Sequence, residues 1–201
     1  MKIDASMVKE LREKTGAGIM DCKEALKSTS GNFTEAIDFL RKKGISSASK
    51  KAGRVSTEGI VSSYVHPGGR IGVLLEVNCE TDFVARTDEF QQFVRNIAMQ
   101  IAASSPQYVN QEDVPVEILE REKEIYRAQA KESGKPDKII EKIVDGKINK
   151  FYSEICLLNQ AYIREDKTLI KDLLTSKIAK IGENISIRRF ARFQLGEKLE
   201  K

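Results

Sequence analysis

Few residues in this chain have the types and spacing that catalysis requires. The single histidine, His66, stands before a Pro-Gly-Gly run, so we expect it in an exposed turn without a serine or cysteine partner. Gly16, Gly18 and Lys23 lack the order of a phosphate-binding loop, and a helical pattern precedes them where such a loop follows a strand. The sequence therefore predicts no catalytic residue, no cofactor site and no metal site, and it predicts an interhelical turn at the glycines.

The cysteines also give no sign of a reactive or metal-binding site. Cys22, Cys79 and Cys156 are odd in number, lie far apart and show no CxxC spacing. This pattern fits reduced thiols in a reducing compartment better than a disulfide framework or a zinc site. We expect them to be small core residues.

The segment LREKTGAGIMDCKEAL, residues 11–26, is the first of two stretches that are more particular than a scaffold requires. Its glycine turn presents Met20 beside charged residues, and methionine adapts well to contact surfaces. The alternative is that Met20 packs in the core of the surrounding helices. Spacing alone favours this alternative.

The second stretch is EVNCETDFVAR, residues 76–86, where a predicted central strand must turn toward the next helix. Loops that leave a rigid strand often carry function, and in this one acidic Asp82 is followed directly by Phe83. In the alternative interpretation, Thr81 caps a short helical turn and Phe83 is buried beneath it. Chemistry alone favours this second interpretation.

Composition describes an ordinary globular protein whose chain, at 201 residues, exceeds the roughly 150 residues of a typical domain. The 34 basic and 30 acidic residues are interspersed, so the net charge of +4 indicates no direct nucleic-acid partner. The charged N-terminal sequence MKIDASMVKE does not suit a secretory signal, and no segment approaches the ~18 uninterrupted apolar residues of a membrane span. We therefore expect a cytoplasmic protein without a membrane partner.

Three short helical patterns occupy the N-terminal region. They are predicted at residues 4–15, 19–29 and 32–44. Asn32 and Glu35 have the spacing of a capping box at the start of the third helix, and Gly44 is expected to end it. Helices this short cannot bury their apolar faces alone, so they should form a small bundle.

The rest of the chain mixes strands with helices, which predicts an α+β fold with an antiparallel sheet core and packed helices. Strands are expected at 58–65, 70–79 and 184–195, and helices at 88–103, 116–132, 137–155 and 168–181. The nearly continuous apolar run 71–77 indicates a central strand. Ser-Gly-Lys-Pro at 133–136 should divide two helices into an antiparallel hairpin with a coiled-coil character. The predicted divisions are a three-helix domain at 1–44, a linker at 45–55, a core hairpin and helix at 56–112, a helical hairpin arm at 113–156, and the rest of the core with its closing strand at 157–201.

Both particular stretches resemble signatures of the bacterial elongation factor Ts family. The segments 97–104 and 181–189 and the helical hairpin are similar to the family too, so the resemblance covers essentially the whole chain. It implies an N-terminal three-helix domain of the ubiquitin-associated kind, an α+β core and a coiled-coil hairpin. The chain has one core hairpin unit where longer members have two, so it resembles the short form.

The resemblance implies a guanine-nucleotide exchange factor, not an enzyme, whose partner is elongation factor Tu in its GDP-bound or nucleotide-free state. It assigns the partner contact to Thr81, Asp82, Phe83 and Val84. Phe83 would wedge into the partner near its nucleotide, while Asp82 would disturb the region that binds the partner's magnesium ion. GDP would then leave and GTP would load during translation elongation.

The resemblance also assigns Arg12 and Met20 to docking of the N-terminal domain on the partner. In the short form it implies pairing of two copies of the chain, so a homodimer is expected. The alternative function is a structural or ribosome-associated interaction protein that uses the three-helix domain only for docking.

Overall fold

The structure is a computed structural model that describes residues 3–132 and 136–198. Helices and an antiparallel sheet combine as the predicted α+β class. The chain divides into two compact units, each built from separate stretches of sequence. The first unit comprises Met1–Ile60, Val77–Phe90 and Asp172–Ser186, and the second comprises Val61–Glu76, Gln91–Lys171 and Ile187–Lys201.

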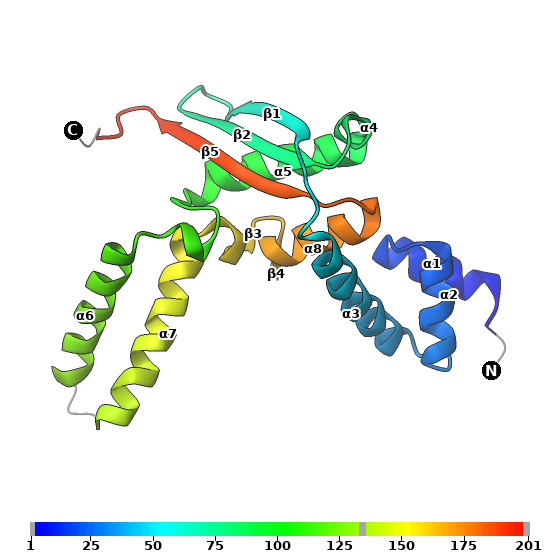
Figure 1. The fold of residues 1–201 in the computed structure, drawn as a ribbon, viewed down its shortest axis with the longest axis horizontal. Coiled ribbons are helices and arrows are strands. Elements are labelled where there is room, and N and C mark those ends of the chain that lie inside the picture. The colour runs from blue at the N-terminus through cyan, green and yellow to red at the C-terminus, as the bar shows by residue number, and fades with distance from the viewer. Residues whose placement is uncertain (1–2, 133–135, 199–201) are drawn as a thin grey trace. The chain divides into compact units, whose positions relative to one another are not determined.

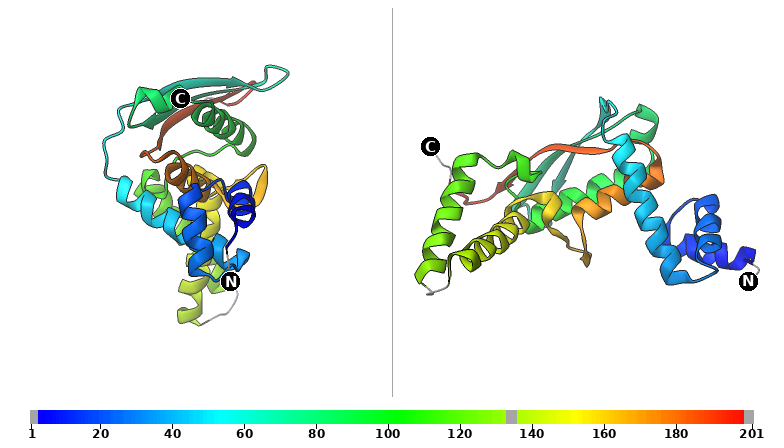
Figure 2. Two further views of the ribbon diagram at one scale, coloured as in Figure 1. Left: turned by 90° about the vertical axis from the view of Figure 1, so that its right-hand side faces the viewer. Right: turned by 60° about the horizontal axis from the view of Figure 1, so that its bottom comes forward.

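The first unit begins with α1 (Ala5–Thr15), α2 (Ile19–Ser28) and α3 (Phe33–Lys51). The side chain of Asp4 accepts a hydrogen bond from the backbone N–H of Met7 at 2.9 Å and so caps α1. Asn32 caps α3 as predicted, because its Oδ1 accepts from the backbone N–H of Glu35. The capping box is incomplete, since the Glu35 carboxylate accepts from the Asn32 side-chain amide and not from its backbone N–H. Both α1 and α2 pack against the first half of α3 (Figure 2). The buried residues of this bundle are Leu11, Cys22, Ala25, Leu26 and Ala36.

The predicted end of the third helix at Gly44 is wrong, as is the linker over its first seven residues. Helix α3 continues through Gly44 to Lys51, and Ala52 forms its C-cap. A Cβ atom on Gly44 would lie 3.5 Å from the Cβ of Ala179, so this glycine lies close to another helix of the same unit. Tertiary packing here overrides the low helix propensity of glycine. The wider division into domains stays a prediction.

A three-stranded sheet among the described residues has the order β1-β2-β5 (Figure 1). Its strands are β1 (Glu58–Val65), β2 (Ile71–Cys79) and β5 (Ser186–Gln194). The prediction of a central second strand and a closing C-terminal strand is confirmed. In the turn of the β1–β2 hairpin, the backbone N–H of His66 donates to the carbonyl of Ile71 at 2.9 Å.

Two helices follow β2. The first is the single turn α4 (Asp82–Ala85), and the second is α5 (Asp88–Ser104). In the second unit, α5 lies against one face of the strands (Figure 2), with Phe93, Val94 and Ile97 fully buried or nearly so. This confirms the helix predicted at 88–103 and the prediction of a sheet core with packed helices.

The predicted helical hairpin is formed by α6 (Val116–Glu132) and α7 (Asp137–Ile155), which lie side by side in Figure 1. Most of the predicted helix-breaking sequence falls outside the described residues, and Pro136 immediately precedes α7. The apolar seam between the helices contains Leu119, Tyr126, Ala130, Ile140, Val144 and Ile148. On α6, Leu119 and Tyr126 therefore face α7, while Ile118 and Ile125, which have the same seven-residue spacing, are exposed.

One small element was not predicted from the sequence. Short strands β3 (Ala161–Tyr162) and β4 (Glu165–Leu169) pair antiparallel and lead directly into α8 (Ile170–Ile181). Fully buried Gln100 holds this ribbon, because its amide donates to the carbonyl of Ala161 and its Oε1 accepts from the N–H of Ile163 at 2.8 Å. Across the described helices we find none with the length and apolar character to span a membrane.

Candidate functional site

The loop between β2 and α5 is fixed at its base by buried residues. Thr81 is the N-cap of α4, and its Oγ1 accepts a hydrogen bond from the backbone N–H of Val84 at 3.3 Å. Val84 and Ala85 are buried beneath this turn. The interpretation in which Thr81 caps a short helix is thereby confirmed, and the structure places the Val84 side chain in the interior.

The side chains of Phe83 and Asp82 lie at the surface, opposite to those of Val84 and Ala85. Phe83 is 77% exposed, so the interpretation that buried it beneath the helix is wrong. Asp82 is also exposed and lies in an ion pair with Arg86, whose guanidinium donates to Asp82 Oδ2 at 2.8 Å. Exposed ion pairs contribute little to stability, so Asp82 can exchange this partner for another. Site reasoning from the sequence did not include Arg86.

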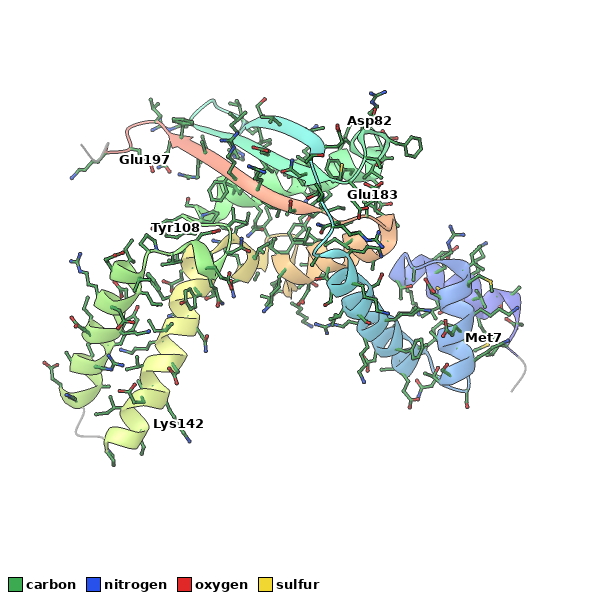
Figure 3. The ribbon with its side chains drawn as sticks, viewed as in Figure 1. Met7, Asp82, Tyr108, Lys142, Glu183 and Glu197 are labelled. Carbon is green, nitrogen blue, oxygen red and sulfur yellow. The ribbon has the colours of Figure 1, made fainter. Side chains whose placement is uncertain are left out.

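Glu183, in the segment that follows α8, holds the start of this loop. Its Oε2 accepts from the backbone N–H groups of Glu80 and Thr81, both at 3.1 Å, and its Oε1 accepts from the Thr81 hydroxyl at 2.7 Å. The backbone N–H of Asn184 donates in return to Glu80 Oε1 at 2.6 Å. In Figure 3 Glu183 lies next to the segment that carries Asp82.

Sequence reasoning assigned no role to Glu183. The only signal was the family likeness of the segment that contains it. A single sequence gives no indication that positions 102 residues apart are in contact. Such a contact follows from the tertiary fold alone.

Cys79 supports the same loop from inside the first unit. Its buried Sγ donates to the carbonyl of Thr81 at 3.1 Å. Burial, together with the negative charge of Glu183, raises the pKa of the Cys79 thiol to about 11, so the group stays neutral near pH 7. The three cysteines, all within the described residues, are free and buried, which confirms their prediction as core residues.

The N-terminal candidates are also at the surface. Met20, in the first turn of α2, is 73% exposed, so the alternative that placed it in the core is wrong. Arg12 is exposed on α1. It lines a surface pocket together with Ile3, Asp4, Ala5, Val8, Lys9, Ile19 and Lys23. Apolar and basic groups thus share this surface.

His66 lies in the exposed hairpin turn, as predicted, with its Nδ1 3.0 Å from the hydroxyl of Tyr64. Within residues 3–132 and 136–198, no cluster of three or more His, Cys, Asp or Glu side chains has an arrangement that could hold a metal ion.

Comparison with known proteins gives matches along the whole chain. The family model described as Elongation factor TS matches residues 2–197. Elongation factor Ts of Geobacter sulfurreducens is 63% identical over 201 residues, which is all of this chain and 93% of that protein. Elongation factor Ts of Carboxydothermus hydrogenoformans is 61% identical over 199 residues, covering 99% of this chain and 92% of that protein. The chain therefore belongs to the elongation factor Ts family.

Proposed function

We propose that this chain is a guanine-nucleotide exchange factor for elongation factor Tu and acts in the cytoplasm during translation elongation. Membership of the elongation factor Ts family supports the partner and the reaction. The observation that carries the proposal is the exposure of Phe83 on a turn that is anchored by the cap at Thr81 and by buried Val84 and Ala85. A large aromatic side chain held outward on a fixed turn is typical of an interface hot spot.

In this proposal Phe83 enters the GTPase near its nucleotide site, and Asp82 leaves Arg86 to act near the partner's magnesium ion. Magnesium requires near-octahedral coordination at about 2.0–2.1 Å, so moving one of its ligands by about one ångström weakens the binding of the ion. Val84 anchors the turn from within. Coupling between two ligands of one protein is reciprocal. A factor that weakens GDP binding to the GTPase therefore binds the GTPase less tightly when nucleotide is present, so incoming GTP releases the factor.

Stopped-flow release of a fluorescent GDP analogue from elongation factor Tu tests this function. We expect the release rate to rise with the concentration of the chain and to reach a plateau, while buffer alone leaves the slow intrinsic rate. Binding without faster release would instead support the docking protein. An absence of both binding and acceleration would contradict both functions.

Met20→Asp is expected to weaken the complex while leaving the fold intact. Because Met20 is largely exposed, its loss creates no cavity, but the new carboxylate lies in the proposed contact with the partner. Titration by isothermal calorimetry and a thermal melt measure the two effects. Val55→Asp, at another exposed apolar residue of the same unit, is the matched control and should bind normally. Equal binding by both variants would remove Met20 from the interface.

A homodimer through the strands of the second unit is the further proposal for assembly. Exposed apolar side chains occur on all three strands there, at Val61, Val65, Leu74 and Phe193. Exposed apolar side chains of this kind can take part in protein interfaces. Light scattering at micromolar concentration should report about twice the chain mass of 22.6 kDa.

Phe193→Lys should shift that mass toward the monomer, because it puts a charge among the apolar side chains. Ile163→Lys, at an exposed apolar position between β3 and β4, is the control and should leave the dimer intact. A wild-type monomer that exchanges nucleotide at the full rate would separate dimer formation from the proposed mechanism.

A further inference from the structure

Two segments of the first unit that are distant in the sequence are joined at the start of the exchange loop, which we define as Glu80–Phe83. Glu183 accepts three hydrogen bonds from this loop, and Asn184 donates one back to Glu80. The Asn184 side chain also donates to the carbonyl of Arg54 at 2.8 Å. Hydrogen bonds to a carboxylate are stronger than those between neutral groups, so this contact is well suited to hold a loop.

The bond from Thr81 to Glu183 also sets the direction of the Thr81 hydroxyl. A hydroxyl has one proton to donate and lone pairs with which to accept. Its proton is directed to Glu183 Oε1 at 2.7 Å, which leaves a lone pair for the N–H of Val84 at 3.3 Å. The carboxylate therefore orients the group that caps α4.

The cap at Thr81 is important for α4 because this helix is a single turn of four residues. A helix of this length does not form on its own, since one turn fixes several backbone dihedrals for very few hydrogen bonds. Buried Val84 and Ala85 hold its underside, and the contact with Glu183 holds its beginning. Loss of that contact would let Asp82 and Phe83 sample many positions without changing the apolar base.

We propose that Glu183 is a positioning residue for nucleotide exchange, and this rests on the exchange function proposed above. Its carboxylate keeps the exchange loop in the one arrangement in which Asp82 and Phe83 reach the partner's nucleotide site. Docking through Arg12 and Met20 uses other residues of the chain. Glu183 therefore governs the maximal rate of GDP release more than the concentration of the chain that gives half of that rate.

Stopped-flow titrations with Glu183→Ala and Glu183→Gln test this separation. In Glu183→Ala the maximal release rate should fall about tenfold or more, because small misplacements of reacting groups cost up to about a hundredfold. The half-saturating concentration should rise by a smaller factor, because Phe83 is still present for contact and docking through Arg12 and Met20 is unchanged. Glu183→Gln should keep most of the rate, since its amide oxygen still accepts from the two backbone N–H groups. Glu89→Ala is the matched control, because this carboxylate in the same unit pairs with Lys177 and Lys180 at 2.8 and 2.6 Å and not with the loop.

A second measurement does not depend on exchange activity. Hydrogen exchange by NMR should show faster exchange of the amides of Glu80 and Thr81 in Glu183→Ala, and rates close to wild type in Glu183→Gln and Glu89→Ala. If wild type fails to accelerate GDP release, the proposed function is wrong. The hydrogen-exchange rates of the Glu80 and Thr81 amides would still show whether Glu183 orders the loop. Unchanged amide exchange, or faster amide exchange with an unchanged maximal rate, overturns the positioning role.

If Glu183→Ala does not fold, variants of Thr81, the other partner in the contact, provide the test. Thr81→Val removes the hydroxyl that bonds Glu183 Oε1 and caps α4, whereas Thr81→Ser keeps it. We expect a lower maximal rate in Thr81→Val and recovery of that rate in Thr81→Ser. Equal rates in the two variants would overturn the proposal.

Discussion

Phe83→Ala is expected to melt within a few degrees of wild type and yet to accelerate GDP release poorly. The side chain is 77% exposed, so its removal leaves almost no cavity and little burial is lost. At an interface hot spot the same truncation costs about 2 kcal/mol or more, roughly thirtyfold in Kd. Differential scanning calorimetry and stopped-flow exchange measure the two effects on one preparation.

Phe90→Ala provides the opposite control within the same unit. Phe90 is 0% exposed, so its truncation should cost about 3–5 kcal/mol of stability, the range for a buried phenylalanine. A collapse of the melting temperature in Phe83→Ala comparable to that in Phe90→Ala would contradict the exposed wedge. An undiminished rate of GDP release with a stable Phe83→Ala would contradict the proposed contact of Phe83 with the partner.

Asp82→Ala tests whether this loop affects the rate of GDP release separately from the affinity for the partner. Asp82 is exposed, and within the described part of the chain its side chain is seen paired with Arg86 alone, so the fold should tolerate its loss. If the carboxylate acts near the partner's magnesium ion, GDP release should slow by a larger factor than the affinity falls. Parallel measurements of affinity and release rate show which of the two changes more.

Local signals in the sequence were sufficient for most helices and strands. Asp4 and Asn32 stand at the predicted starts of the first and third helices and cap them there. A cap is readable from sequence because it depends only on groups within three residues. Gly44 was misjudged for the complementary reason. Its place within α3 depends on a nearby helix, at Ala179, which no local pattern contains.

The candidate site was predictable in part. The sequence indicated that the loop after β2 was special, but chemistry alone favoured a buried Phe83 beneath a capped turn. Val84 and Ala85 occupy the interior there, which leaves Phe83 outside. The contact of Thr81 with Glu183 could not be inferred, since it joins the ends of two elements that meet only in the folded unit.

Gly59 in β1 lies beside the end of β2 from which the exchange loop departs. Its φ of +140° lies in a region that only glycine adopts easily, and a Cβ atom there would stand 2.2 Å from the carbonyl oxygen of Val77 and 2.7 Å from the Cα of Asn78. Both neighbours are backbone atoms of the paired strand. They can move only if the pairing of β1 with β2 is disturbed.

Gly59→Ala is therefore expected to destabilise the fold by about 3 kcal/mol or more, of which backbone strain alone supplies about 1–3 kcal/mol. For a chain of this size the melting temperature should fall by roughly 6 °C or more. Gly68→Ala is the matched control, because Gly68 also has a positive φ, +93°, but nothing lies within 4 Å of the added Cβ. It should lose only the strain, about 1 kcal/mol. Equal melting temperatures for the two variants would mean that the close approach of the strands at Gly59 does not limit stability. A larger loss in Gly59→Ala, with slower GDP release at temperatures where the variant is folded, would connect the strand pairing to the position of the exchange loop.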